Sequence, residues 1–163
     1  MMFDNNLILS GAITSAGLTG QALSIASSTA VNSDNVIDLM QNRDLGTCDN
    51  LFLYIKLLTQ FTPATSVATA LEINLVAVDT STDAGNSSNY TIAGTGDNYI
   101  QTLNAKGEFL LKLSPQFDVV GRRYLMLKYW RALGTETVAG SVFAALTMGA
   151  NVIDNYPAGY LII

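Results

Sequence analysis

The sequence contains no histidine, a single cysteine and few charged side chains. Without histidine the commonest general base is missing, so Ser-His-Asp triads, Cys-His pairs and His-ligated metal sites are excluded. Cys48 alone can form neither an internal disulfide nor a paired-thiolate metal site. A nucleophilic lysine would have to be desolvated, and three of the four lysines fall in strand patterns that place them in solvent. We therefore expect no enzyme activity, no cofactor, no metal and no small-molecule substrate.

The acidic residues offer two further sites to weigh. Asp79–Gly85 begins like a calcium loop, but Tyr90 holds the twelfth position, where a chelating glutamate is expected, so a solvated turn is the simpler interpretation. A glycosidase would need two carboxylates as acid and base. The closest pairs are Asp34 with Asp38 and Asp79 with Asp83, and neither lies beside aromatic residues that would bind a sugar.

Charged residues make up only 13% of the chain, whereas about 25% is typical of a soluble domain. Apolar residues make up 49%, so the surface has to be largely uncharged polar and apolar. Such a surface is expected where other protein copies cover it, the alternative being a sparsely charged monomer. The net charge of −5 disfavours a nucleic-acid partner.

Long hydrophobic runs are also absent. No stretch of 18 apolar residues exists, which predicts that no segment spans a membrane. The residues before the short apolar run Leu7–Ile13 include Asp4 but no Lys or Arg, so a secretory signal is not indicated and we expect the protein to stay in the cytoplasm where it is made.

Short strand patterns separated by glycine-marked turns fill most of the chain from residue 51 onward. Leu71–Val78 shows the clearest alternation, with Leu71, Ile73 and Leu75 on one face. The expected strands are Leu51–Leu58, Leu71–Val78, Tyr90–Ile92, Asn98–Leu103, Glu108–Leu113, Arg123–Trp130 and Ser141–Met148. The pattern predicts an all-β fold, a jelly-roll-like β-sandwich of about eight antiparallel strands. The one helix candidate is Asn35–Met40.

Both ends of the chain are poor in charge. At 163 residues we expect a single domain, 1–163, with an alternative for 1–33 between a buried strand pair and an N-terminal arm. Gly11, Gly17 and Gly20 favour strand and loop over helix there. The apolar end, Tyr156–Ile163, is expected to be an edge strand or to dock on a partner.

Several of these segments resemble the capsid cement proteins of short-tailed bacteriophages. The resemblance covers about residues 30 to 150 and is carried, in order, by Asp34–Leu39, Arg43–Gly46, the strand from Leu51, Leu71–Val78, Arg122–Tyr129 and Gly140–Leu146. It implies a jelly-roll sandwich that dimerises and clamps adjacent major-capsid subunits on the outside of an icosahedral head. The apolar C-terminal end and the nearly uncharged first 33 residues depart from the family pattern.

We therefore expect a decoration, or cement, protein on the outer surface of a phage head, with the major capsid protein and itself as partners, as a homodimer or alternatively a trimer. The planar guanidinium of Arg43 suits a carboxylate partner, although a local salt bridge at a turn explains it equally. The interface residues that we expect are Phe3, Leu7, Arg43, Asp44, Leu45, Tyr156, Tyr160, Leu161 and Ile162.

A carbohydrate-binding jelly-roll module is the alternative function. Its stacking platform would come from the aromatic residues Tyr54, Tyr90, Tyr99, Tyr124, Tyr129 and Trp130. Because most of these residues lie within strand patterns, core packing is the competing interpretation for them.

Overall fold

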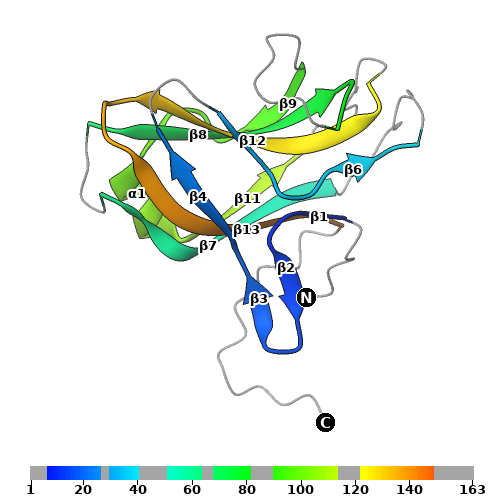
Figure 1. Ribbon diagram of the computed structural model, residues 1–163, viewed down its shortest axis with the longest axis horizontal. Coiled ribbons are helices and arrows are strands. Elements are labelled where there is room, and N and C mark those ends of the chain that lie inside the picture. The colour runs from blue at the N-terminus through cyan, green and yellow to red at the C-terminus, as the bar shows by residue number, and fades with distance from the viewer. Residues whose placement is uncertain are drawn as a thin grey trace.

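The computed structural model describes residues 7–26, 30–40, 51–63, 68–81, 90–113 and 122–148. Two antiparallel sheets, here called sheet I and sheet II, pack face to face as a β-sandwich (Figure 1). The expected all-β fold is confirmed. Within the described residues, no helix is long and apolar enough to cross a membrane.

Sheet I is centred on its two longest strands, which pair along most of their length. Two short strands share the outer edge of β13, and β11 forms the opposite edge. In spatial order the strands are β1 (Ile8–Ser10) with β4 (Gln21–Ile25), β13 (Val138–Met148), β7 (Leu51–Thr62) and β11 (Glu108–Lys112).

Sheet II is built in the same way around β12 and β8. Two short strands share each outer edge. In spatial order the strands are β5 (Val31–Asn32) with β6 (Ile37–Asp38), β12 (Tyr124–Leu133), β8 (Ala70–Val78), and β9 (Tyr90–Gly94) with β10 (Asn98–Tyr99). Each sheet thus has four strand positions.

The inner faces of the two sheets supply the core. Leu53 and Ile55 of β7 and Ile73 and Leu75 of β8 are completely buried in one cluster, as the alternation in β8 predicts. Strands expected at Leu51–Leu58, Leu71–Val78, Tyr90–Ile92, Glu108–Leu113, Arg123–Trp130 and Ser141–Met148 are confirmed, with ends that differ by a few residues.

Two predictions of secondary structure were wrong, one of a helix and one of a strand. Asn35–Met40 contains strand β6 instead of a helix, because Ile37 and Asp38 pair with the edge of β12. Asn98–Leu103 is not one strand: β10 ends at Tyr99, and α1 (Ile100–Lys106) follows. Ile100 and Leu103, three positions apart on a helix, both bury their side chains in the core, and this tertiary packing outweighs the β-propensity of the segment.

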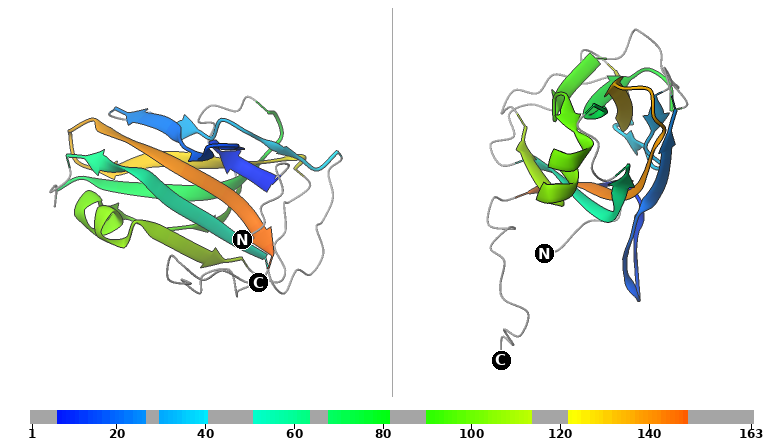
Figure 2. Two further views of the ribbon diagram at one scale, coloured as in Figure 1. Left: turned by 90° about the horizontal axis from the view of Figure 1, so that it is seen from below. Right: turned by 90° about the vertical axis from the view of Figure 1, so that its left-hand side faces the viewer.

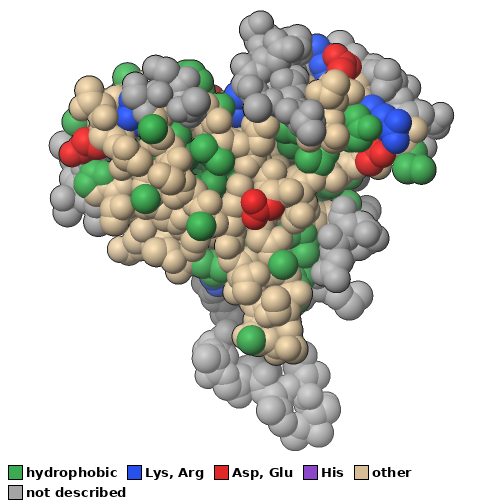
Figure 3. All heavy atoms as spheres, in the orientation of Figure 1, with side chains coloured by type: hydrophobic (Ala, Val, Ile, Leu, Met, Phe, Trp, Pro, Cys, Tyr) green, Lys and Arg blue, Asp and Glu red, His purple; other side chains and the backbone are tan. Residues whose placement is uncertain are grey.

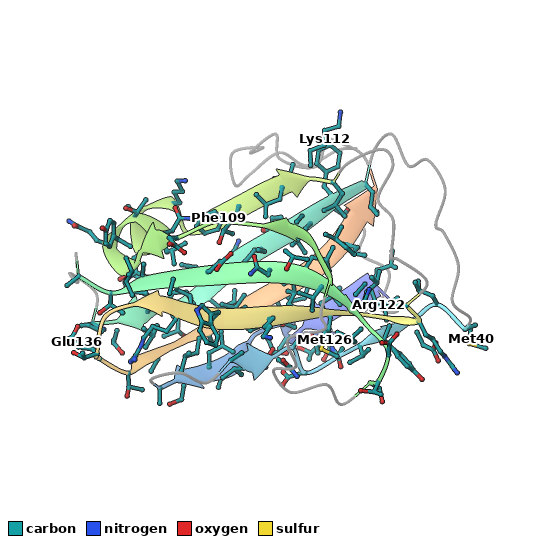
Figure 4. The ribbon with its side chains drawn as sticks, turned by 90° about the horizontal axis from the view of Figure 1, so that it is seen from above. Met40, Phe109, Lys112, Arg122, Met126 and Glu136 are labelled. Carbon is teal, nitrogen blue, oxygen red and sulfur yellow. The ribbon has the colours of Figure 1, made fainter. Side chains whose placement is uncertain are left out.

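The sandwich has two distinct ends. At one end, here called the helix end, lie α1 and the turn at Glu136; at the other, here called the Leu51 end, lie Arg122 and Met40 (Figure 4). Leu51 pairs with Met148 at that end, and the Leu113 N–H donates to the Leu51 carbonyl.

Candidate interaction surface

A β-hairpin interrupts the outer edge of sheet I. Strand β1 pairs with β13 at Ala144 and Ala145, and β4 resumes the pairing of the same edge at Val142. Between them the chain leaves the sheet as β2 (Ala12–Thr14) and β3 (Gly17–Thr19), which pair only with each other. Figures 1 and 2 show this hairpin projecting from the body of the sandwich. It is an insertion into what would otherwise be one continuous edge strand.

The hairpin carries no charged side chain between Ala12 and Thr19, and its surface shows only uncharged polar and hydrophobic groups (Figure 3). Its turn is held by the Thr14 hydroxyl, which accepts from the Ala16 N–H at 3.3 Å and donates to the Gly17 carbonyl at 2.9 Å. Ile13 and Leu18 are paired across the two strands. Leu18 packs against the outer face of sheet I, while the Ile13 side chain is 38% exposed.

A glycine lies at each end of the hairpin, where the chain leaves sheet I at Gly11 and returns to it at Gly20. Gly11 has a φ of +79°, and a Cβ there would overlap the Thr19 carbonyl oxygen. Gly20 faces the Ser141 hydroxyl and the Val142 N–H so closely that a Cβ would lie at 3.2 Å from each of those heavy atoms. A side chain at Gly11 would overlap the second strand of the hairpin, and one at Gly20 would be in tight contact with β13, so glycine at both positions lets the two strands leave the sheet side by side.

Side-chain hydrogen bonds connect both ends of the hairpin to the segment 32–35, which begins in sheet II. Gln21 donates from Nε2 to the Asn32 carbonyl at 2.7 Å and accepts from the Asp34 N–H at 3.1 Å. Asn35 donates from Nδ2 to the Gly11 carbonyl at 3.1 Å, and its N–H donates to the Leu9 carbonyl at 3.0 Å. These bonds hold the base of the hairpin in place, whereas its turn makes no hydrogen bond of this kind to sheet II within the described residues.

A groove of about 610 Å³ runs between the base of the hairpin and the segment that enters β6. Its lining combines apolar side chains with polar groups, among them the side chains of Asn35 and Asp38. Asp38 is its one charged lining residue, and Arg123 neutralises it through two hydrogen bonds of 2.7 and 2.6 Å. This arginine also holds the pKa of the Asp38 carboxyl below its usual value. The lining residues are Leu7, Ile8, Gly11, Ala12, Ile13, Asn35, Val36, Ile37 and Asp38.

One predicted interface residue, Leu7, lies in this groove. The others, Phe3, Arg43, Asp44, Leu45, Tyr156, Tyr160, Leu161 and Ile162, lie outside the described residues. Met40 and Met148, the last described residues before the segments 43–45 and 156–162, both lie at the Leu51 end. The hairpin itself was not predicted; its sequence signal is the glycine spacing of Gly11, Gly17 and Gly20 within an uncharged segment.

The aromatic residues of the alternative function divide into three groups. Tyr129 is buried in the core between the sheets, Tyr54 is buried in a smaller cluster that Leu18 joins, and Tyr124 is half-buried against a third cluster, so packing within the protein explains all three. Tyr99 and Trp130 are exposed. The side chain of Tyr90 lies outside the described residues.

Within the part of the chain that the structure describes, no three Asp, Glu, Cys or His side chains come together in a way that could hold a metal ion. Most of the Asp79–Gly85 loop lies outside that part. No protein-family model matches the sequence, and no curated protein matches it either.

Proposed function

We propose that the protein decorates the outer surface of a phage head, where it binds the major capsid protein and further copies of itself and so stabilises the shell. The observation that carries this proposal is the uncharged hairpin Ala12–Thr19, which projects from the sheet edge beside a groove whose one charged residue, Asp38, is paired with Arg123.

The hairpin and groove suit a protein partner. Backbone groups along the free edges of a projecting hairpin can pair with a strand or loop of another chain, which is a common way to gain affinity without charged contacts. Ile13 offers an exposed apolar anchor at the groove, and few charges there need to be desolvated on binding. Repeated weak contacts over an icosahedral shell add up through multivalency.

The strand order supports the jelly-roll part of the proposal. Counting the strands that share an edge as one position, sheet I reads 1-8-3-6 and sheet II reads 2-7-4-5 in chain order. Successive strands thus alternate between the sheets except for the fourth and fifth, which are neighbours. This order is the one expected when a long hairpin of strands is rolled up into two facing sheets.

The test is binding to expanded empty heads that lack decoration protein, measured by co-sedimentation. Ile13→Asp places a charge at the groove, and we expect it to weaken head binding by at least about tenfold. Leu133→Asp is the matched control, because Leu133 is 48% exposed at the helix end, away from the hairpin, and this variant should bind as the unchanged chain does.

Sedimentation velocity tests the self-association, for which we expect a dimer, with a trimer as the alternative. A strictly monomeric chain that fails to bind heads overturns the proposal. Unchanged head binding by Ile13→Asp overturns the assignment to the hairpin.

A further inference from the structure

A second exposed apolar patch lies far from the hairpin, on the outer face of sheet II. Trp130 is 38% exposed, Tyr99 45% and Leu133 48%. Together they are half of the large hydrophobic side chains that the described residues expose. We call these three side chains the aromatic patch.

Strand register explains why they gather. Tyr99 of β10 and Leu133 of β12 both pair with Ala70 of β8, one from each side. Trp130 pairs with Glu72, which is two positions further along β8 and therefore points to the same face as Ala70. Tyr129, next to Trp130, points the other way and is completely buried in the core. A register irregularity between Arg131 and Leu133 brings Leu133, three positions after Trp130, opposite Ala70, so the patch spans three adjacent strands on one face.

Two charged side chains, Glu72 and Lys128, border the patch. Glu72 lies opposite Trp130, and Lys128 lies two positions before Trp130 on the same face. Within the described residues the side chains of Glu72 and Lys128 form no hydrogen bond or ion pair with one another or with any other residue. The carboxylate and the ammonium group are therefore available to a ligand, and their charges cancel.

The orientation of this face separates it from the hairpin. The hairpin extends on the side of sheet I, away from β8 and β12 (Figure 1), and the outer face of sheet II is the one seen from above in Figure 4. A molecule attached through the hairpin would turn the aromatic patch outward.

We propose that the aromatic patch binds neutral carbohydrate, with pyranose rings stacked on Trp130 and Tyr99 and their hydroxyl groups hydrogen-bonded to Glu72 and Lys128. A sugar ring has an apolar C–H face and a rim of hydroxyl groups, which matches an indole or phenol ring bordered by a donor and an acceptor. The balanced pair gives no attraction for an anionic glycan, and the net charge of −5 opposes one. This inference goes beyond the shell-binding function and does not require it.

Trp130 is the only tryptophan of the sequence, so its fluorescence reports on the patch alone. The full chain would be titrated with dextran, mannan, galactomannan and a soluble β-glucan, and screened on a printed array of neutral oligosaccharides. We expect at least one neutral glycan to change the emission of Trp130 and to retard the protein in an affinity gel that contains it.

Substitutions at Tyr99 and Trp130 test whether these two residues bind the glycan. We expect Tyr99→Ala and Trp130→Ala each to weaken retardation by about tenfold, and Trp130→Phe, which keeps an aromatic face, to weaken it less. Ile13→Asp is the control and should bind glycan normally, whereas Trp130→Ala should bind heads normally. A failure of the head-binding proposal can thereby be told apart from a failure of the glycan-binding proposal.

Three results would overturn the proposal. One is that no neutral glycan changes the emission or the mobility. Another is that retardation persists unchanged in Trp130→Ala. The third is that Trp130→Ala converts an oligomer into a monomer without affecting retardation, which would make the patch a contact between copies of the chain.

Discussion

The hydroxyl groups of Ser10 and Tyr129 meet at 2.6 Å inside the core, although the two residues are 119 positions apart in the sequence. Ser10 ends β1, directly before the hairpin, and Tyr129 lies in the middle of sheet II. Both side chains are completely buried. The bond therefore ties the sheet edge that carries the hairpin to the opposite sheet, and it satisfies two polar groups that would otherwise be costly to bury.

Tyr129→Phe should destabilise the protein by about 1.5 kcal/mol, because the Ser10 hydroxyl is left without its partner in the core. Urea unfolding measures this. The double variant with Ser10→Ala should lose less than the sum of the two single variants, since both partners are then removed. Tyr124→Phe is the control at a half-buried position. Strict additivity of the two single variants would show that the bond contributes nothing.

Alkaline pH should destabilise the fold through two buried tyrosines. Burial, followed by the nearby Glu108 carboxylate, raises the pKa of Tyr54 from 10 to about 12. Burial also raises the pKa of Tyr129. A raised tyrosine pKa means that the unfolded chain releases the proton first, so this stability is present below about pH 10 and is lost as the pH rises toward 12.

Absorbance titration at alkaline pH, followed together with circular dichroism, checks this. Of the seven tyrosines, Tyr54 and Tyr129 should ionise late, Tyr129 only as the fold is lost. Tyr54→Phe should remove one late-ionising group. Ionisation of Tyr54 and Tyr129 near pH 10 with the fold intact would contradict the assignment.

Gly11→Ala should distort the base of the hairpin. The position has a positive φ and a Cβ there would overlap the Thr19 carbonyl, so we expect a loss of about 2 kcal/mol and weaker head binding. Gly17→Ala is the matched control, because its φ of +121° is equally unsuited to alanine while no atom lies within 4 Å of the added Cβ. Equal effects of the two variants would show that backbone strain alone, and not the overlap with the Thr19 carbonyl, causes the loss.

Asn104 links α1 to β7 through a reciprocal pair of hydrogen bonds. It accepts from the Phe61 N–H and donates to the Phe61 carbonyl, both at 2.8 Å. Asn104→Ala leaves two backbone groups of Phe61 without these partners and should cost about 2 kcal/mol in urea unfolding. Gln101→Ala, on the exposed side of the same helix, should change stability by less than about 0.5 kcal/mol. Because alanine favours a helix more than either asparagine or glutamine, a loss in Asn104→Ala cannot come from helix propensity, and an unchanged stability would show that the bonds to Phe61 contribute little.

Local alternation was enough to predict the long strands. In Leu71–Val78 the core-facing positions are set by a period of two that tertiary context does not override, because both sides of β8 are paired. The segment Asn98–Leu103 shows where such reasoning fails. Its apolar residues fit a strand equally well, and only the packing of Ile100 and Leu103 against the core selects a helix.

The candidate surfaces were less accessible to prediction. The single charged residue among the first 33, Asp4, marked an unusual segment, and Leu7 was among the expected interface residues. Six aromatic residues were equivalent in sequence, yet Trp130 is exposed and its neighbour Tyr129 is buried. The alternation of a strand puts two consecutive side chains on opposite faces of the sheet, but it does not say which of the two points toward the other sheet.

By itself the sequence determined the class of fold and the absence of histidine chemistry, because residue composition and a period of two are local properties. The tertiary structure alone decided that the uncharged N-terminal segment projects as a hairpin, and that Tyr99, Trp130 and Leu133 share one face. Both depend on pairing between residues far apart in the chain, and the partner of a strand edge follows from packing over the whole molecule.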